Sequence, residues 1–131
     1  MRVLGSISLP GVTRSAPRAR AFVGRVAGDR LRVDAEVLGD IGLCVGELVA
    51  NACEHTASGQ GGRVAVVVEA RRAVVRVTVI DDGGADGKPH VAEPFGEDGR
   101  GLRLVEALAA GWGVDEADGG SAVWAEFPAA V

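Results

Sequence analysis

The sequence has few of the features that mark membrane, secreted or nucleic-acid-binding proteins. It has no apolar run long enough to span a membrane, and its N-terminus has no signal-peptide core. Its cysteines, Cys44 and Cys53, are too far apart on one expected helix to form a disulfide, and they are not spaced as a zinc pair. The formal net charge of −4 argues against a general nucleic-acid binder. We therefore expect a soluble cytoplasmic protein with buried thiols and no direct contact with nucleic acid or membrane.

The length of 131 residues and an apolar content of 47% suit a single domain with a real core. We find no internal repeat, low-complexity tract or linker, so we expect one domain over residues 1–131. Ser15 is expected to cap the first helix, with Pro17 in its first turn. Periodicity predicts a strand, two helices, two strands, a helix and two strands. The expected ranges are 2–9, 15–28, 34–56, 63–69, 73–81, 99–109, 112–116 and 121–127.

Helices and antiparallel strands are grouped in this order and do not strictly alternate. This grouping predicts an α/β (α+β) two-layer sandwich, with a mixed, mostly antiparallel sheet and helices on one face. Residues 86–98 have no periodicity and are rich in glycine, proline and charge. Compact domains rarely keep so long a loop without a use, so we expect a lid at about 85–99.

The second helix carries a carboxylate and a carboxamide one turn apart, Glu47 and Asn51. An ionised glutamate can accept a proton from a hydroxyl, and the asparagine oxygen is a hard ligand that suits Mg²⁺. Taken alone, the pair is more often two polar residues on a solvated helix flank. Motifs in the second half of the chain decide between these two interpretations.

Asp81-Asp82-Gly83 comes at the end of a valine-rich strand. A carboxylate at this position can accept a hydrogen bond from an exocyclic amine such as the adenine N6 group. A glycine two residues later leaves room for a flat base. The alternative is an ordinary Asp-Gly turn, which is the better interpretation of this segment by itself.

Gly99-Arg100-Gly101-Leu102 joins the expected lid to a helix start. Free backbone N–H groups and the positive end of the helix dipole make such a junction an anion site, to which Arg100 could add a charge-assisted contact. The alternative is a helix start that the glycines make flexible, with an arginine exposed to solvent and no bound anion. The segment is neither a Walker-type loop nor a dinucleotide fingerprint.

These three segments together resemble the nucleotide-binding boxes of the Bergerat-fold (GHKL) ATPases, which include gyrase B, MutL and the histidine kinases. More narrowly, the chain is similar to stand-alone anti-sigma-factor serine/threonine kinases of the RsbW and SpoIIAB type, in their short actinobacterial version. The motifs that carry this resemblance are Glu47-Leu-Val-Ala-Asn51 with its extension to Thr56, Asp81-Asp-Gly83, and Gly99-Arg-Gly101-Leu.

The resemblance implies that Glu47 is a general base and that Asn51 binds Mg²⁺. It implies that Asp81 holds the adenine of ATP or ADP, with Gly83 beneath the base, and that the phosphates are wrapped by Gly99, Arg100, Gly101 and Leu102. It also implies a homodimer that sequesters a sigma factor and phosphorylates an anti-sigma-factor antagonist. This chain departs from the family pattern at Ala85, where a glycine is common, and in an acidic lid.

Two other functions stay open on the sequence alone. The chain could be a nucleotide-dependent protein-binding switch without kinase activity, in which ATP only shifts a conformational population. It could also be a catalytic fragment of a histidine-kinase-like system, although the missing phospho-acceptor domain argues against this. His55 could be a phospho-acceptor, but a partly buried residue at the helix end is the better interpretation. Trp112 and Trp124 are expected to pack on the sheet or to line a protein contact.

Overall fold

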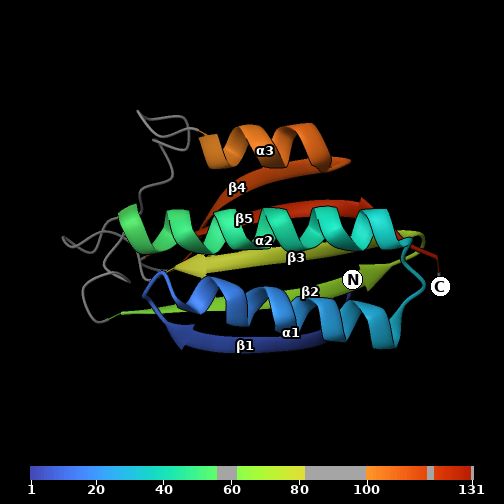
Figure 1. Cartoon of the computed structure of the whole chain (residues 1–131), viewed down its shortest axis with the longest axis horizontal. Coiled ribbons are helices and arrows are strands. Elements are labelled where there is room, and N and C mark those ends of the chain that lie inside the picture. The colour runs from blue at the N-terminus through green and yellow to red at the C-terminus, as the bar shows by residue number, and fades with distance from the viewer. Residues whose placement is uncertain (56–61, 82–99, 118–119, 131) are drawn as a thin grey trace.

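A computed structural model describes residues 1–55, 62–81, 100–117 and 120–130. These residues form one five-stranded sheet and a layer of helices (Figure 1). The strand order across the sheet is β1-β2-β3-β5-β4. The elements are β1 (Arg2–Pro10), α1 (Ser15–Arg30), α2 (Ala35–His55), β2 (Arg63–Arg71), β3 (Val74–Asp81), α3 (Arg100–Leu108), β4 (Gly111–Ala117) and β5 (Gly120–Pro128).

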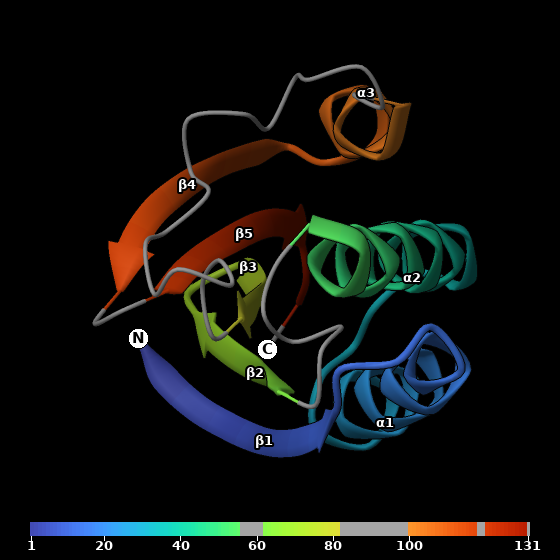
Figure 2. The ribbon, with the colours of Figure 1, turned by 90° about the vertical axis from the view of Figure 1, so that its left-hand side faces the viewer.

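All three helices lie on the same side of the sheet, with α2 between α1 and α3 (Figure 2). This arrangement confirms the predicted two-layer α+β sandwich. The predicted order of elements is also confirmed. No helix among the described residues is long and apolar enough to cross a membrane.

The sheet has two faces of different character because side chains alternate along each strand. The helix-covered face is apolar and carries buried residues such as Val66, Val77 and Phe127. The open face carries the other residues of the same strands, such as Arg76 and Trp124. Sulfur and small side chains of α2, including Cys44 and Cys53, are buried against the helix-covered face, and both thiols are free, as expected.

The sheet is not mixed, because every strand pair among the described residues is antiparallel. The expectation of some parallel pairing was wrong for a topological reason. The connection from β3 through α3 to β4 does make these two strands run the same way, but β5 lies between them and pairs with both. The parallel strands are therefore never neighbours.

Two local predictions are corrected by the structure. Ser15 is not the cap of α1, because Arg14 precedes the helix and Ser15 instead donates its hydroxyl hydrogen bond to the Pro10 carbonyl at 2.6 Å. The turn between β2 and β3 is also shorter than the predicted 70–72, since Arg71 still pairs with Val74. Ala73 makes this tight turn with a positive φ of 62°.

Candidate functional site

The described residues of the three predicted motifs lie at one end of the molecule. Figure 1 shows the C-terminal end of α2, the C-terminal end of β3 and the first turn of α3 at the same end. The sequence separates these segments widely, and the antiparallel topology brings them together. This end of the helix-covered face is the candidate site.

Asp81 is the last residue of β3, and it lies on the helix-covered face in line with Val75, Val77 and Val79. Only 8% of its surface is exposed. The Ser121 hydroxyl, from the start of β5, donates a hydrogen bond to Asp81 Oδ2 at 2.9 Å. A buried carboxylate is costly without such donors. An ionised carboxylate has about four lone-pair positions, so the serine bond is compatible with an amine donor from a ligand.

The position of Asn51 follows from the packing of α2. Gly46 marks the flank of α2 that meets α1, because a Cβ on Gly46 would lie 3.1 Å from Cδ of Arg20. Asn51 is about 140° further round the helix, on the far side of the sheet-facing stripe. Since α3 packs on the flank opposite α1 (Figure 2), the half-buried Asn51 lies on the flank of α2 that faces α3. The structure thus directs Asn51 toward α3.

Glu47 lies one turn before Asn51 and is exposed on the outer side of α2. Its carboxylate is close enough to Cys44 to affect that thiol. Burial is the largest cause that raises the pKa of Cys44, to about 11, and the carboxylates of Asp40 and Glu47 raise it further. Because the Glu47 side chain is exposed, a proton donor that approaches from solvent can reach its carboxylate.

The third motif supplies the start of α3. Leu102 is buried with 2% exposure and fixes the first turn of α3 in the core with Val105. The backbones of Arg100 and Gly101 form that first turn. A helix of nine residues presents unpaired N–H groups and a partial positive charge at this end. An anion at this end of the site would meet those groups.

In a comparison with protein-family models, residues 9–127 match the histidine kinase-like ATPase domain. The chain belongs to the histidine kinase-like ATPase family. The match includes all three motifs and nearly the whole chain. A comparison with curated proteins gives no significant match.

The site fits the nucleotide and metal of a histidine kinase-like ATPase in its chemistry. Asp81 with Ser121 offers a buried, oriented acceptor, Asn51 offers a hard oxygen, and α3 offers N–H donors. The described residues contain no group of three His, Cys, Asp or Glu side chains that could hold a metal by themselves. Mg²⁺ in nucleotide sites commonly uses one or two protein oxygens together with phosphate oxygens. The single predicted ligand, Asn51, is consistent with that use.

Several predicted features lie outside the described residues. These are Gly83, Gly99, the lid at 85–99, Ala85 and the side chains of His55 and Arg100. Their roles stay predictions.

Sequence reasoning missed Ser121. The sequence does contain a signal for Ser121. Side chains alternate along the last strand, so Ser121 and Val123 lie on the same face as the buried Ala125 and Phe127. A polar residue at an inward position of a strand is a candidate for a site. What the sequence did not reveal was that β5 pairs with β3, which brings Ser121 next to Asp81.

Proposed function

We propose that this histidine kinase-like ATPase domain binds ATP or ADP with Mg²⁺ at the end of α2, β3 and α3, and that it is a serine/threonine protein kinase of the anti-sigma-factor type. The observation that carries the proposal is the buried Asp81 held by Ser121 on a face that is otherwise apolar. A buried carboxylate has no evident stabilising role there, but it can select the amine edge of adenine.

Each residue of the site has one task in this proposal. Asp81 accepts the adenine amine, and Ser121 orients the Asp81 carboxylate. Asn51 contributes an oxygen to Mg²⁺, and the first turn of α3 with Arg100 binds phosphate oxygens. The bound magnesium nucleotide supplies the transferable phosphoryl group and neutralises part of its charge.

Glu47 is the proposed general base. Its exposed position lets the hydroxyl of a partner's serine or threonine approach it, as transfer to a protein requires. The hydroxyl proton passes to Glu47, the hydroxyl oxygen forms a bond to the γ-phosphorus, and ADP leaves with the bridging oxygen. Catalysis of this kind depends mainly on positioning and electrostatics.

The proposed partners are an anti-sigma-factor antagonist, which receives the phosphoryl group, and a sigma factor, which a homodimer of this chain sequesters. The support for these partners is the resemblance of the motifs Glu47–Thr56, Asp81–Gly83 and Gly99–Leu102 to anti-sigma-factor kinases. The alternative is a nucleotide-dependent binding switch with the same site but no phosphoryl transfer, and an assay of that transfer distinguishes the two.

Calorimetric titration tests the nucleotide site. ADP and a non-hydrolysable ATP analogue are titrated with and without Mg²⁺ into wild type, Asp81→Asn and Asn51→Ala. Loss of a hydrogen bond to a charged group costs about 1.5–3 kcal/mol, so we expect Asp81→Asn to weaken ADP binding by roughly 10- to 150-fold. Asn51→Ala should remove the Mg²⁺ dependence. The matched control is Asp115→Asn, an exposed carboxylate on β4, which should bind as wild type. No binding by wild type at millimolar nucleotide would overturn the proposal.

Phosphoryl transfer is tested separately with ATP labelled at the γ-phosphate and purified candidate antagonist proteins. We expect a phosphoserine or phosphothreonine product with wild type. Glu47→Gln should lose this product while it keeps nucleotide affinity, and Glu36→Gln, an exposed glutamate at the other end of α2, should retain both. Binding of an antagonist without any product would favour the switch.

A further inference from the structure

The two edges of the sheet differ in charge. Among the described residues, β1 at one edge pairs only with β2, and β4 at the other edge pairs only with β5. The sequence of β4 contains Asp115 and Glu116, whereas the only charged residue of β1 is Arg2. An unpaired edge can accept a further strand through its backbone groups, and natural edges are usually protected by charges, prolines or bulges.

The edge protection of β1 lies mainly at its ends, although Arg63 of β2 also donates hydrogen bonds to Ser8 Oγ at 2.9 Å and to the Ser8 carbonyl at 3.0 Å, so that this carbonyl is already engaged. A register shift interrupts the strand between Val3 and Gly5, and Pro10 ends it. The stretch between them, 5–9, is regular and uncharged. Five strand residues span about 17 Å, which is enough for a short extended segment to pair with.

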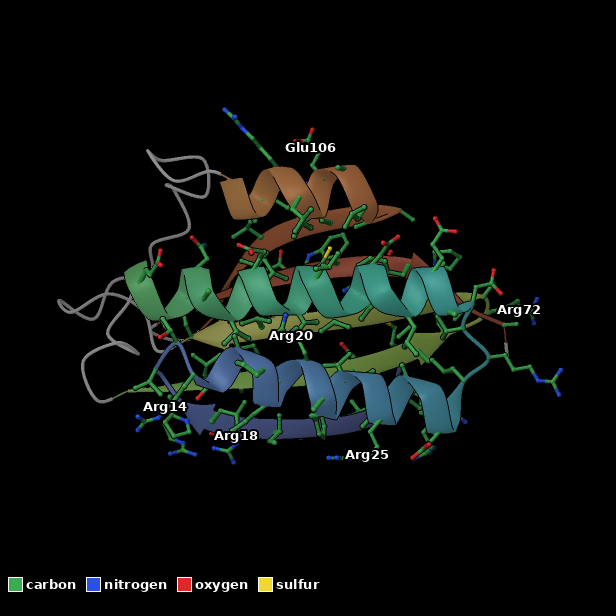
Figure 3. The ribbon with its side chains drawn as sticks, viewed as in Figure 1. Arg14, Arg18, Arg20, Arg25, Arg72 and Glu106 are labelled. Carbon is green, nitrogen blue, oxygen red and sulfur yellow. The ribbon has the colours of Figure 1, made fainter. Side chains whose placement is uncertain are left out.

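The helix beside this edge is basic. Arg14, Arg18 and Arg25 are exposed, and the one acidic residue of α1 is Asp29, near its C-terminal end. On a helix these three arginines fall within about 40° of one another, so they form one stripe. Figure 3 shows all three side chains on the side of α1 away from α2.

The stripe borders the free edge of β1. Gly5 of β1 lies against α1, because a Cβ added there would be 3.2 Å from Phe22 and 3.3 Å from Val26. Arg18 and Arg25 are about 40–60° round the helix from Phe22, on the outer side. Arg20, by contrast, lies on the flank that meets α2 at Gly46. In both ribbon views, β1 and α1 form the same border of the molecule (Figures 1 and 2).

We propose that the free edge of β1 at residues 5–9, together with the arginine stripe Arg14, Arg18 and Arg25, binds an extended acidic segment of a partner protein by strand addition. Main-chain hydrogen bonds to the edge supply affinity, and the arginines select acidic side chains. The distance from Arg14 to Arg25 along α1 is about 16 Å, which matches the free edge. Side chains on one face of a strand recur about every 6.6 Å, so acidic residues at alternate positions fit the stripe.

A second copy of this chain fits the edge less well. Pairing of two β1 edges would bring two arginine stripes together across a two-fold axis, and like charges repel. The β4 edge of another copy offers acidic residues that are adjacent in the sequence, whereas the stripe calls for acidic residues two apart. The proposed surface is independent of the nucleotide site, since α2 separates α1 from α3 (Figure 2).

The test uses a fluorescein-labelled nine-residue peptide in which glutamate alternates with valine and threonine, titrated into the whole protein by fluorescence anisotropy. We expect saturable binding that weakens with salt. The double variant Arg18→Glu/Arg25→Glu should bind the peptide at least about tenfold more weakly, because two attractive contacts become repulsive. The matched control is Arg72→Glu, an exposed arginine at the far turn of the sheet, which should bind as wild type (Figure 3).

Two control peptides separate strand addition from simple charge attraction. One has the same composition with its glutamates contiguous, and the other is N-methylated at alternate backbone nitrogens, prepared in both registers. Strand addition predicts weaker binding of the contiguous peptide and of one N-methylated register. It also predicts slower hydrogen exchange at β1 amides when the alternating peptide binds. Asp81→Asn should bind this peptide as wild type does.

Three outcomes would overturn the proposal. The first is equal binding of all the peptides, or no binding of the alternating peptide. The second is binding of a short DNA duplex or of vesicles containing anionic lipid through the same arginines, without binding of the peptide. The third is self-association that is lost in the double variant, which would assign the edge to a second copy.

Discussion

The two faces of the sheet are built from the same strands but differ in how deeply their side chains are buried. On the helix-covered face β5 places Ala125 and Phe127 in the core. One residue away in the sequence, the open face holds Trp124 and Glu126, which are only half-buried. The covered face is apolar except at one end, where Asp81 and Ser121 pair. Polar groups in a dry layer reduce stability unless they are paired, and here Asp81 and Ser121 pair with each other.

The open face is stabilised by a small polar cluster instead of a core. The Arg76 guanidinium lies 4.2 Å from the centroid of the Trp124 ring, which permits a cation–π contact. Arg76 Nε also donates a hydrogen bond to Glu126 Oε2 at 2.8 Å. These groups face solvent on one side, so each contact is worth less than burial of an apolar side chain.

The largest effect should come from truncation on the covered face. Phe127→Ala should lower the free energy of unfolding by about 3–5 kcal/mol, because it leaves a cavity at a site that is 2% exposed. Trp124→Ala, on the open face of the same strand, should cost less although tryptophan is larger. Urea unfolding measures both, and Phe127→Leu provides a milder variant if Phe127→Ala does not fold. Equal costs would show that the open face is as well packed as the covered one.

An alanine at Gly113 should be the next most damaging change. A Cβ at this position would lie 2.5 Å from Cζ2 of Trp124, so the ring must leave its place over the strand. We expect a loss of about 1–3 kcal/mol, as for other overpacked sites. Gly111→Ala is the matched control on the same strand and face, because its nearest neighbour is Glu126 Oε1 at 4.0 Å. A stable Gly113→Ala would mean that the Trp124 ring is held only loosely.

The pH dependence of stability should reveal how strongly the thiol of Cys44 is buried. Burial, then Asp40 and Glu47, raise the pKa of Cys44 from 9.0 to about 11 in the folded chain. The unfolded chain ionises first as pH rises, so the stability that this thiol contributes is complete below pH 9 and is lost toward pH 11. The unfolding midpoint of wild type should fall more steeply between pH 9 and about 11 than that of Cys44→Ala. Parallel curves would contradict the raised pKa.

The smallest effect should come from the open-face ion pair. Glu126→Gln keeps the size of the side chain but removes the charge that meets Arg76 at 2.8 Å and Arg71 at 3.5 Å. Partly exposed pairs of this kind are worth under about 1 kcal/mol, and salt screens them. The loss should therefore shrink between low and high salt. Glu106→Gln on α3, whose side chain points away from the molecule in Figure 3, controls for the change in net charge.

The sequence was sufficient to predict elements whose signal is periodic. The two-layer fold and the long helix with Glu47 and Asn51 were both predicted from local pattern and are confirmed. The roles of the site residues stay predictions, because the structure holds no ligand that would test them.

The predictions that were wrong depended on hydrogen-bond partners that the local pattern does not reveal. Nothing in Arg71-Arg72-Ala73 resembles a turn that favours a positive φ, yet Ala73 adopts φ 62°. Pairing of Arg71 with Val74 and a hydrogen bond from the Ala129 N–H to the Ala73 carbonyl hold it there. Ser15 likewise bonds to Pro10 across the β1–α1 turn. A single sequence does not reveal such partners.

The position of β5 between β3 and β4 has a consequence for how the site comes into being. β5 follows every other strand in the chain, but it occupies an interior place in the sheet. During synthesis on a ribosome, β3 and β4 therefore lack the strand that pairs with both of them until β5 emerges. Because Ser121 belongs to β5, the hydrogen bond from Ser121 to Asp81 can form only at that moment. In the proposed function, the nucleotide site is complete only when the sheet is completed, so ligand capture would report that folding has finished.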